Sequence, residues 1–402
     1  MKEVSKIQFI FLITGLLLVF SVGWLISNDR KHIKFKNIAI MFILQLIISF
    51  LCLNTTGGVY VMDKIAIFFN WLMLQAASGV DFVFGGLVVQ KGTSVFFLNV
   101  LMPIVFISAL VGILNYIRVL PFIIKWIGWT LNKIAGMGEL ESYFAVSTAI
   151  LGQPEVFLTV KDDIPKLTEE RLYTICASAM SAVSASVLAA YMQLIPDKFV
   201  VTAVFLNIFS ALMVSCIINP YNASNYDTMP MSKNEEKNHE SFFQVLGDYI
   251  LDGFKLAVTV AAMLIGFVAL VNFLNSIFVA IFNISFTTIL GYIFSPIAFL
   301  MGVPTKDSIK VGSLMATKLL TNEFVAMSSL HNMSSTLSLK ANAIISAYLV
   351  SFANFSVVGI ITGSIKSISS KQGITVANFS MKLLLGATLA SILTGTIVGL
   401  YY

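Results

Sequence analysis

Two short polar groups stand out in this 402-residue sequence, because each interrupts an apolar stretch. The first is Gly152-Gln153-Pro154-Glu155, within the run 143–160, and the second is Asn322-Glu323, within the run 311–330. Each group places a carboxamide close to a carboxylate. An amide offers two donors and an acceptor, and a carboxylate accepts short, strong hydrogen bonds. These residues are therefore suited to recognising a small polar molecule.

The composition places both groups in a lipid bilayer. Hydrophobic residues make up 57% of the chain, charged residues 11%, and the mean hydropathy is +0.90, whereas soluble domains carry roughly a quarter charged residues. A span needs about 20 apolar residues, so the chain can supply about eight to ten. We expect an all-α, multi-pass protein of the cell (inner) membrane. An ionisable group at mid-bilayer costs roughly 2.5–3.5 kcal/mol, so Glu155 and Glu323 are functional candidates.

The apolar pattern predicts where the chain crosses the membrane. Polar residues interrupt the segment 63–89, which favours an interfacial or re-entrant segment there. The polar stretch 222–241 contains Pro230 and mixed charges, and is predicted to be a solvated loop. The predicted apolar stretches are 7–26, 38–53, 96–116, 172–194, 200–218, 254–282, 287–301, 343–365 and 383–401.

The two polar groups are predicted to lie in interrupted helices. Pro154 lacks an amide hydrogen and disfavours helical geometry in the residue before it, so 143–160 reads as two short helices forming a re-entrant hairpin. The run 311–330 follows the breaker Gly302-Val303-Pro304. Lys318 and Glu323 would point about 140° apart on one regular helix, so a local salt bridge does not readily explain Glu323.

Each predicted hairpin is followed by a span that contains small polar residues. These are Ser181, Ser184 and Ser186 in the first half, and Ser351, Asn354 and Ser356 in the second. Interrupted segments at corresponding places in two halves are typical of transporters built from repeats, which bind substrate near the midplane. The alternative is that the serines are packing contacts between close helices.

Other classes of function find little support. The net charge of +5 is small and spread out, so no nucleic-acid partner is expected. The cysteines, Cys52, Cys176 and Cys216, lie in apolar runs without metal spacing, so neither a metal nor a cofactor is predicted. An enzyme would need a nucleophile, base or metal beside the two carboxylates. A channel would need a continuous polar lining, whereas these polar groups cluster at one depth.

Longer motifs resemble one known family. The run Ala316–Met327 (ATKLLTNEFVAM) is similar to the signature of the concentrative nucleoside transporters, and Gly152-Gln153-Pro154-Glu155 resembles their Gly-Gln-Ser/Thr-Glu hairpin tip. The segments 82–85 (FVFG) and 352–356 (FANFS) also resemble family segments, so the matches extend from about residue 79 to 360. The Asn-Glu-Phe-Val-Ala motif is highly specific, and the chain has the size of a bacterial nucleoside permease.

The resemblance implies a cation-coupled nucleoside importer. It implies a homotrimer whose protomers have a scaffold and a mobile transport domain built from inverted repeats, with elevator-type alternating access. Gln153 and Glu155 would face the nucleobase, while Glu323, Asn354 and Ser356 would hold the ribose hydroxyls. Phe352 would add an aromatic face. A carrier for another polar metabolite, such as a nucleobase, is the alternative, and such a carrier should tolerate loss of the ribose-directed residues.

Three departures from the family pattern bear on specificity and coupling. Pro154 replaces the Ser/Thr of the hairpin tip and removes a hydroxyl near the base. Sodium-coupled members place an Asn five residues before the tip Gln, and a Ser or Thr in the following span. Here these positions are Thr148 and Ala182, which weakens a site for a hard cation. We therefore favour protons over sodium, with Glu155 and Glu323 as candidate carriers and Thr148 as a candidate ion ligand.

The domain prediction follows from these assignments. We expect N-terminal scaffold helices (1–61), an interfacial segment with further scaffold helices (62–142), the first repeat (143–220), the polar loop with scaffold helices (221–300), and the second repeat (301–402).

Overall fold

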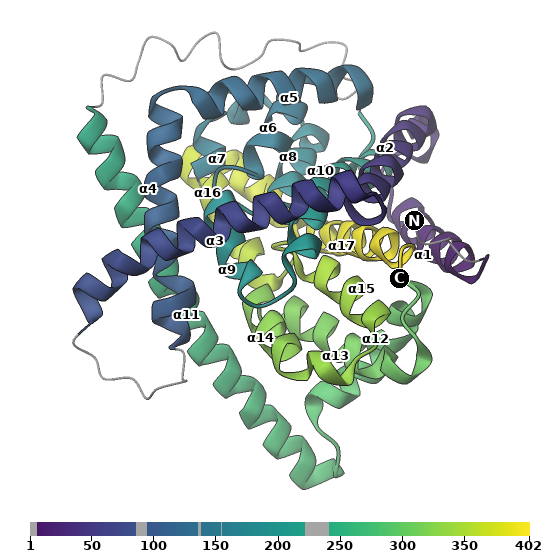
Figure 1. Ribbon diagram of the computed structural model, residues 1–402. Helices are drawn as coiled ribbons and strands as arrows, with labels where there is room; N and C mark the ends of the chain where they lie inside the picture. The colour runs from purple at the N-terminus through teal and green to yellow at the C-terminus, as the bar shows by residue number, and fades with distance from the viewer. Residues whose placement is uncertain (1–5, 86–94, 136–137, 154, 222–240) are drawn as a thin grey trace.

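The computed structural model describes residues 6–85, 95–135, 138–153, 155–221 and 241–402, which form helices and turns without strands (Figure 1). Eight helical stretches in this part of the chain are long and apolar enough to cross a membrane, by length and composition. This confirms an all-α membrane protein with about eight spans. The stretches are α1 (Lys6–Leu25), α2 (Phe35–Asn54), α3 (Thr56–Phe84), Phe97–Tyr116 including α4, Glu169–Met192 comprising α8 and α9, α10 (Asp197–Ile218), α11 (Phe242–Phe282) and α17 (Ser370–Gly399).

The segment 63–89 is predicted to be interfacial or re-entrant, and the structure bears on the second of these alternatives. The helix α3 continues without a break to Phe84, so the described part of this segment is not a re-entrant hairpin. The polar residues that interrupt the apolar pattern, Asn70, Gln75 and Asp81, are exposed on this helix. An exposed polar side chain need not break a helix, and this explains why the helix continues through them. Residues 86–89 and 222–240, which include most of the predicted polar loop, lie outside the described residues.

The two halves of the chain present their elements in the same order. Each half has one helix, a second helix, two helices separated by a break, two more separated by a break, and a long final helix. The first half comprises α4 (Pro103–Tyr116), α5 (Val119–Ala135), α6 (Glu139–Thr148), α7 (Glu155–Leu158), α8 (Glu169–Ser181), α9 (Ala185–Met192) and α10. The second comprises α11, α12 (Phe286–Leu300), α13 (Thr305–Leu320), α14 (Glu323–Met333), α15 (Leu339–Leu349), α16 (Phe355–Ile368) and α17.

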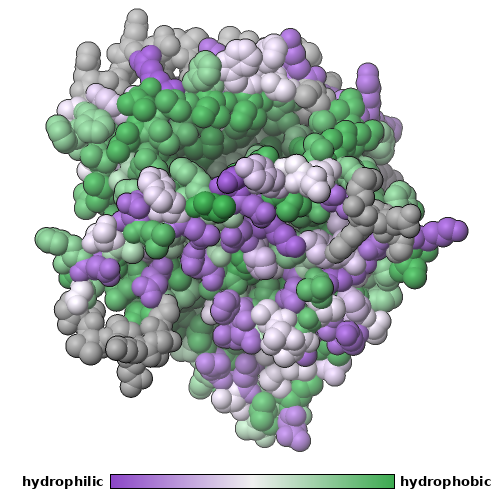
Figure 2. Space-filling model, viewed as in Figure 1, coloured by the Kyte–Doolittle hydropathy of each residue, from purple (hydrophilic) through white to green (hydrophobic). Residues whose placement is uncertain are grey.

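The interior is built from the later helices of each half. The helices α8, α10 and α17 are largely buried, whereas α1, α2, α3 and α11 have mostly exposed surfaces. The helices α1 and α2 pack against α10 and α17, which places the first and last helices side by side (Figure 1). Figure 2 shows hydrophobic side chains over much of the visible face, as expected for lipid contact, with hydrophilic ones gathered toward its middle and lower parts.

The helices α4 and α11 form a close pair because glycines face neighbouring side chains between them. A Cβ on Gly112 of α4 would lie 2.6 Å from Cγ of Tyr249, and one on Gly253 of α11 would lie 2.7 Å from Cβ of Ser108. Asn115 also donates a hydrogen bond to the Tyr249 hydroxyl at 3.0 Å. Small residues permit such close approach between membrane helices.

Candidate functional site

The centre of the candidate site is the break between α13 and α14. The helix α13 ends at Leu320, and Asn322 caps the next helix by accepting a hydrogen bond from the amide of Val325 at 3.0 Å. An Asn at this position satisfies an amide that the helix itself leaves unpaired. Glu323 therefore starts α14, at the positive end of the helix dipole, where a carboxylate is stabilised.

Three elements far apart in the sequence meet at the Glu323 carboxylate. The Tyr191 hydroxyl on α9 donates to Oε1 at 2.9 Å, and the Asn354 amide donates to Oε2 at 3.0 Å. Glu323 is only 5% exposed. The structure thus brings together Glu323 and Asn354, both predicted site residues, and adds Tyr191, which the sequence analysis did not identify. A tyrosine in an apolar run needs a partner for its hydroxyl when buried, and this was the available signal.

Asn354 lies in a second break, between α15 and α16. Its side-chain oxygen caps α16 by accepting from the Val357 amide at 3.0 Å, so only its amide donor points to Glu323. Because the oxygen is committed to the cap, the orientation of the amide is fixed. Phe352 and Ser356 lie in the same segment, on either side of Asn354, and are half-buried.

The first predicted tip is also interrupted, as expected. The helix α6 ends at Thr148 and α7 begins at Glu155, whose Oε2 accepts from the Gly152 amide at 3.1 Å. The Gln153 amide donates to the carbonyl oxygen of Ala179 on α8. Both predicted base-facing residues are half-buried. Pro154 lies outside the described residues.

A broken helix connects the two tips. The amide of Ala185, at the start of α9, donates to the carbonyl oxygen of Ile150 at 3.3 Å. The same short helix carries Tyr191, which contacts Glu323. The first tip therefore packs on α8 and the start of α9, while the second tip binds the end of α9. The short helix α9 is the element that both tips share.

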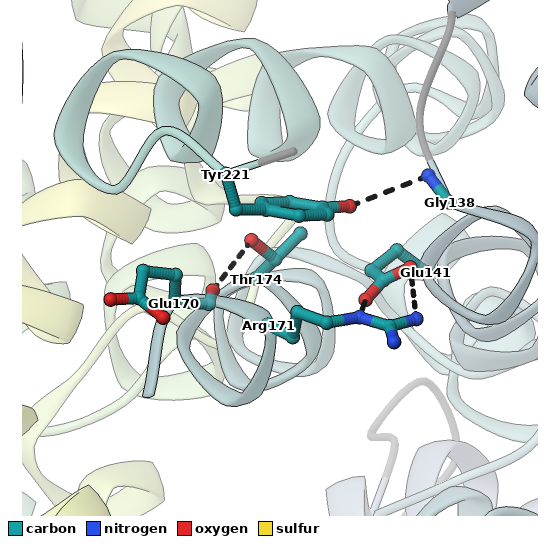
Figure 3. A network of polar contacts seen from close by, with 6 residues as sticks. All are labelled: Gly138, Glu141, Glu170, Arg171, Thr174 and Tyr221. Atoms are coloured by element: carbon teal, nitrogen blue, oxygen red, sulfur yellow. Dashed lines mark hydrogen bonds and ion pairs between the residues drawn. The ribbon is translucent and has the colours of Figure 1, made fainter. Parts of the chain in front are cut away.

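A buried ion pair holds α6 to α8, and the sequence analysis missed it. Arg171 binds Glu141 through two bonds, from Nε at 2.5 Å and from Nη2 at 3.1 Å (Figure 3). Glu141 is fully buried and Arg171 nearly so. The amide of Gly138 donates to the Tyr221 hydroxyl at 3.4 Å, and a Cβ on Gly138 would lie 2.1 Å from Glu141 Oε2. A side chain at this position would force the carboxylate to move from its place beside Arg171.

Comparisons with known proteins agree with this architecture. Three family models match the chain: the Na⁺ dependent nucleoside transporter N-terminus at residues 14–87, Nucleoside recognition at 97–198, and the Na⁺ dependent nucleoside transporter C-terminus at 199–399. The purine nucleoside transport protein NupG of Bacillus subtilis is 35% identical, covering 98% of this chain and 99% of that protein. The putative nucleoside permease NupX of Escherichia coli is 29% identical, covering 97% and 98%.

Solved structures show the same fold. CNTnw in an inward-facing substrate-bound state superposes with a TM-score of 0.93 at 29% identity, covering 99% of this chain and 98% of that one. A CNTnw variant in an outward-facing state gives the same score and coverage. The apolar spans, the helix breaks and these relatives define a multi-pass membrane transporter of the cell membrane, and not an enzyme. The chain belongs to the Na⁺ dependent, or concentrative, nucleoside transporter family, which confirms the resemblance of its motifs.

Proposed function

We propose that the protein imports nucleosides by cation symport, and that Glu323 holds the ribose. The observation that carries this proposal is the arrangement of Tyr191 and Asn354 around one buried carboxylate. An ionised carboxylate has about four acceptor sites. Two protein donors leave capacity for vicinal ribose hydroxyls, and charge-assisted bonds to hydroxyls are short and strong. Relatives named as purine nucleoside transporters and nucleoside permeases support this substrate class.

The base would bind toward the first tip. Gln153 and Glu155 lie at this tip, where Gln153 contacts Ala179 on α8. The broken helix α8–α9 also reaches Glu323 through Tyr191, so we expect one substrate to contact both tips. Phe352 and Ser356 flank Asn354 and would line the space beside the sugar. A carrier for a free nucleobase is the alternative. Such a carrier would not need a buried carboxylate placed to accept hydrogen bonds from ribose hydroxyls, which is the role proposed for Glu323.

For coupling we favour protons over sodium. The Thr148 hydroxyl donates within its own helix, to the carbonyl oxygen of Ala145 at 2.8 Å, and Ala182 in the neighbouring break has no side-chain oxygen. A hard cation needs several oxygen ligands. Carboxylates such as Glu155 or Glu323, held away from water, can exchange a proton instead. The description of the matching family models as Na⁺ dependent argues for the other coupling ion, so the choice must be measured.

We extend the proposal to movement and assembly. Solved relatives are described in outward-facing, intermediate and inward-facing states, which supports alternating access. An elevator motion of a transport domain, carrying two re-entrant hairpins in inverted repeats, fits the repeated order of elements. In this scheme 143–220 and 301–402 form the repeats, while 1–61, 62–142 and 221–300 supply scaffold. A homotrimer would provide the fixed frame.

Uptake into proteoliposomes tests the function and the coupling together. We expect radiolabelled uridine or inosine to accumulate when a proton gradient is imposed, and to equilibrate without accumulation under a sodium gradient alone. Dissipating the proton gradient with an ionophore is the control. Accumulation driven only by sodium would keep nucleoside transport and reject proton coupling. Failure of both nucleosides to enter under either gradient would reject the proposed function.

Replacing Gln153 with Ala should change base preference more than maximal uptake. The variant loses the amide that would read the donor and acceptor edge of a base. We expect the apparent affinities for purine and pyrimidine nucleosides to change by different factors, roughly tenfold at most for one hydrogen bond. Competition of unlabelled nucleosides against labelled uridine measures this. Equal weakening for all nucleosides would place Gln153 away from the base.

A further inference from the structure

Lys318 is a buried charge that the proposed substrate site does not use. It lies in the last turn of α13 and is completely buried. A lysine in the middle of a membrane segment is costly and is expected to have specific partners. The break at Thr321 and Asn322 separates Lys318 from Glu323, so the two charges lie on different helices.

The partners of Lys318 are oxygen atoms on α15, in the break that follows α15, and on α17. Its Nζ donates to the carbonyl oxygen of Tyr348 at 2.6 Å, to the Ser351 hydroxyl at 2.6 Å, and to the Ser391 hydroxyl at 3.4 Å. An ammonium group has three hydrogens, and these contacts use all three. Nζ also lies 4.4 Å from the centre of the Tyr348 ring, within range of a cation–π contact. The ammonium is coordinated much as a small bound cation would be.

The position of this cation matches the polarity of the helix break. The helix α15 ends at Leu349, so the Tyr348 carbonyl is among those that α15 leaves unpaired, at the negative end of its dipole. Across the break, Asn354 caps the start of α16 and donates to Glu323. The Lys318 ammonium therefore binds the C-terminal end of α15, and the Glu323 carboxylate binds Asn354, the residue that caps the start of α16.

The first half of the chain has no such lysine at the corresponding position. The helix α6 corresponds to α13 by its place in the order of elements, and the break at 182–184, after α8, corresponds to the break after α15. The residue at the end of α6 is Thr148, whose hydroxyl bonds within its own helix. Lys318 instead reaches out of α13 to the end of α15. The second break thus contains a cation that the chain itself supplies.

We infer that Lys318 is a positioning residue, a tethered cation that fixes the break between α15 and α16 and thereby orients Asn354 and Glu323 for substrate. The role in substrate binding rests on the proposed nucleoside transport. The Lys318 side chain itself is not assigned a contact with substrate. Removing the ammonium leaves the Tyr348 carbonyl and the Ser351 hydroxyl without their strongest donor, so the break should loosen.

The test uses Lys318→Ala in purified full-length protein, with and without methylammonium. We expect nucleoside affinity, measured by equilibrium binding in detergent, to fall by about tenfold or more, as for loss of a charge-assisted hydrogen bond. Amide hydrogen exchange of segment 350–357 should become faster. Methylammonium should restore slow exchange and affinity, because it returns a small cation to the vacated space. Lys310→Met, at an exposed lysine on the same helix, is the matched control and should leave both readouts unchanged.

The two readouts separate failure of this inference from failure of the proposed function. If the wild-type protein binds no nucleoside, the proposed function fails, while exchange at 350–357 still tests the role of Lys318. Unchanged exchange in Lys318→Ala, or faster exchange that methylammonium does not reverse, would overturn the inference. If Lys318→Ala does not fold, Ser351→Ala and Ser391→Ala each remove one ligand and should produce smaller changes in the same direction. Unchanged exchange and affinity in both serine variants would then overturn the inference.

Discussion

Replacing Glu323 with Gln is expected to reduce nucleoside uptake on the order of a hundredfold or more, because two charge-assisted hydrogen bonds are worth roughly 1.5–3 kcal/mol each. The glutamine has one acceptor oxygen where the carboxylate has two. The NH₂ group of the glutamine must therefore face either Tyr191 or Asn354. Both of these residues donate to the carboxylate in the wild-type protein, so one donor would meet another donor. Asn354 cannot reverse its amide without giving up the cap on α16. The variant also loses any role of Glu323 in carrying a proton.

The measurement is initial-rate uptake into proteoliposomes at matched protein density. Glu169→Gln removes an exposed carboxylate at the start of α8, and should transport as the wild type does. A nucleobase tested alongside the nucleoside distinguishes the alternative carrier, which should lose little activity in Glu323→Gln. Wild-type nucleoside uptake by Glu323→Gln would contradict the assignment of ribose recognition.

Replacing Arg171 with Ala should destabilise the protein by about 3–5 kcal/mol, since it leaves the buried Glu141 carboxylate without its partner. The pair links α6 to α8, so α6 should lose its attachment before the rest of the protein unfolds. Thermal unfolding in detergent, followed by intrinsic fluorescence or by loss of the monodisperse species, measures the change. Arg30→Ala, at an exposed arginine, should produce a much smaller effect.

The double variant Glu141→Met, Arg171→Met gives the sharper comparison. Replacing both charges with apolar side chains of similar length removes the cost of burying them, so most of the stability should return. If the double variant is as unstable as Arg171→Ala, the loss comes from packing around the guanidinium and not from an unpaired charge.

The sequence predicted about eight spans, because a lipid-facing helix must be continuously apolar. The exception is α3, whose polar residues obscured a continuous helix. It also located the first break, where Pro154 and Gly152 disfavour helix. The break between α13 and α14 was harder to predict, since neither proline nor glycine occurs at Thr321 and Asn322. The breaker identified from the sequence, Gly302-Val303-Pro304, instead marks a bend of 116° between α12 and α13. An Asn caps a helix only where the chain already turns, so the residue type alone does not predict the cap.

The partners of the site residues were less predictable. Glu323 and Asn354 were paired through family resemblance, and Tyr191, which completes the group, is 132 residues away in the sequence. Glu141 lies among polar residues at a helix start and looks like a solvated carboxylate in the sequence. Its burial results from the packing of α6 on α8, which no local pattern encodes. The assignment of 1–61 to a scaffold stays a prediction; α1 and α2 pack on α10 and α17, helices placed in the two repeats.

The length of α11 has a consequence for the surrounding lipid. Its 41 residues extend about 60 Å at the usual rise per residue, about twice the thickness of a hydrocarbon core. A helix this long must tilt strongly or emerge into the headgroups, and hydrophobic mismatch then depends on acyl-chain length. Because Gly112 and Tyr249 hold α11 tightly to α4, a change in bilayer thickness would alter the tilt of both helices together. The acyl-chain length of the surrounding lipid is thus expected to set the tilt of α4 and α11.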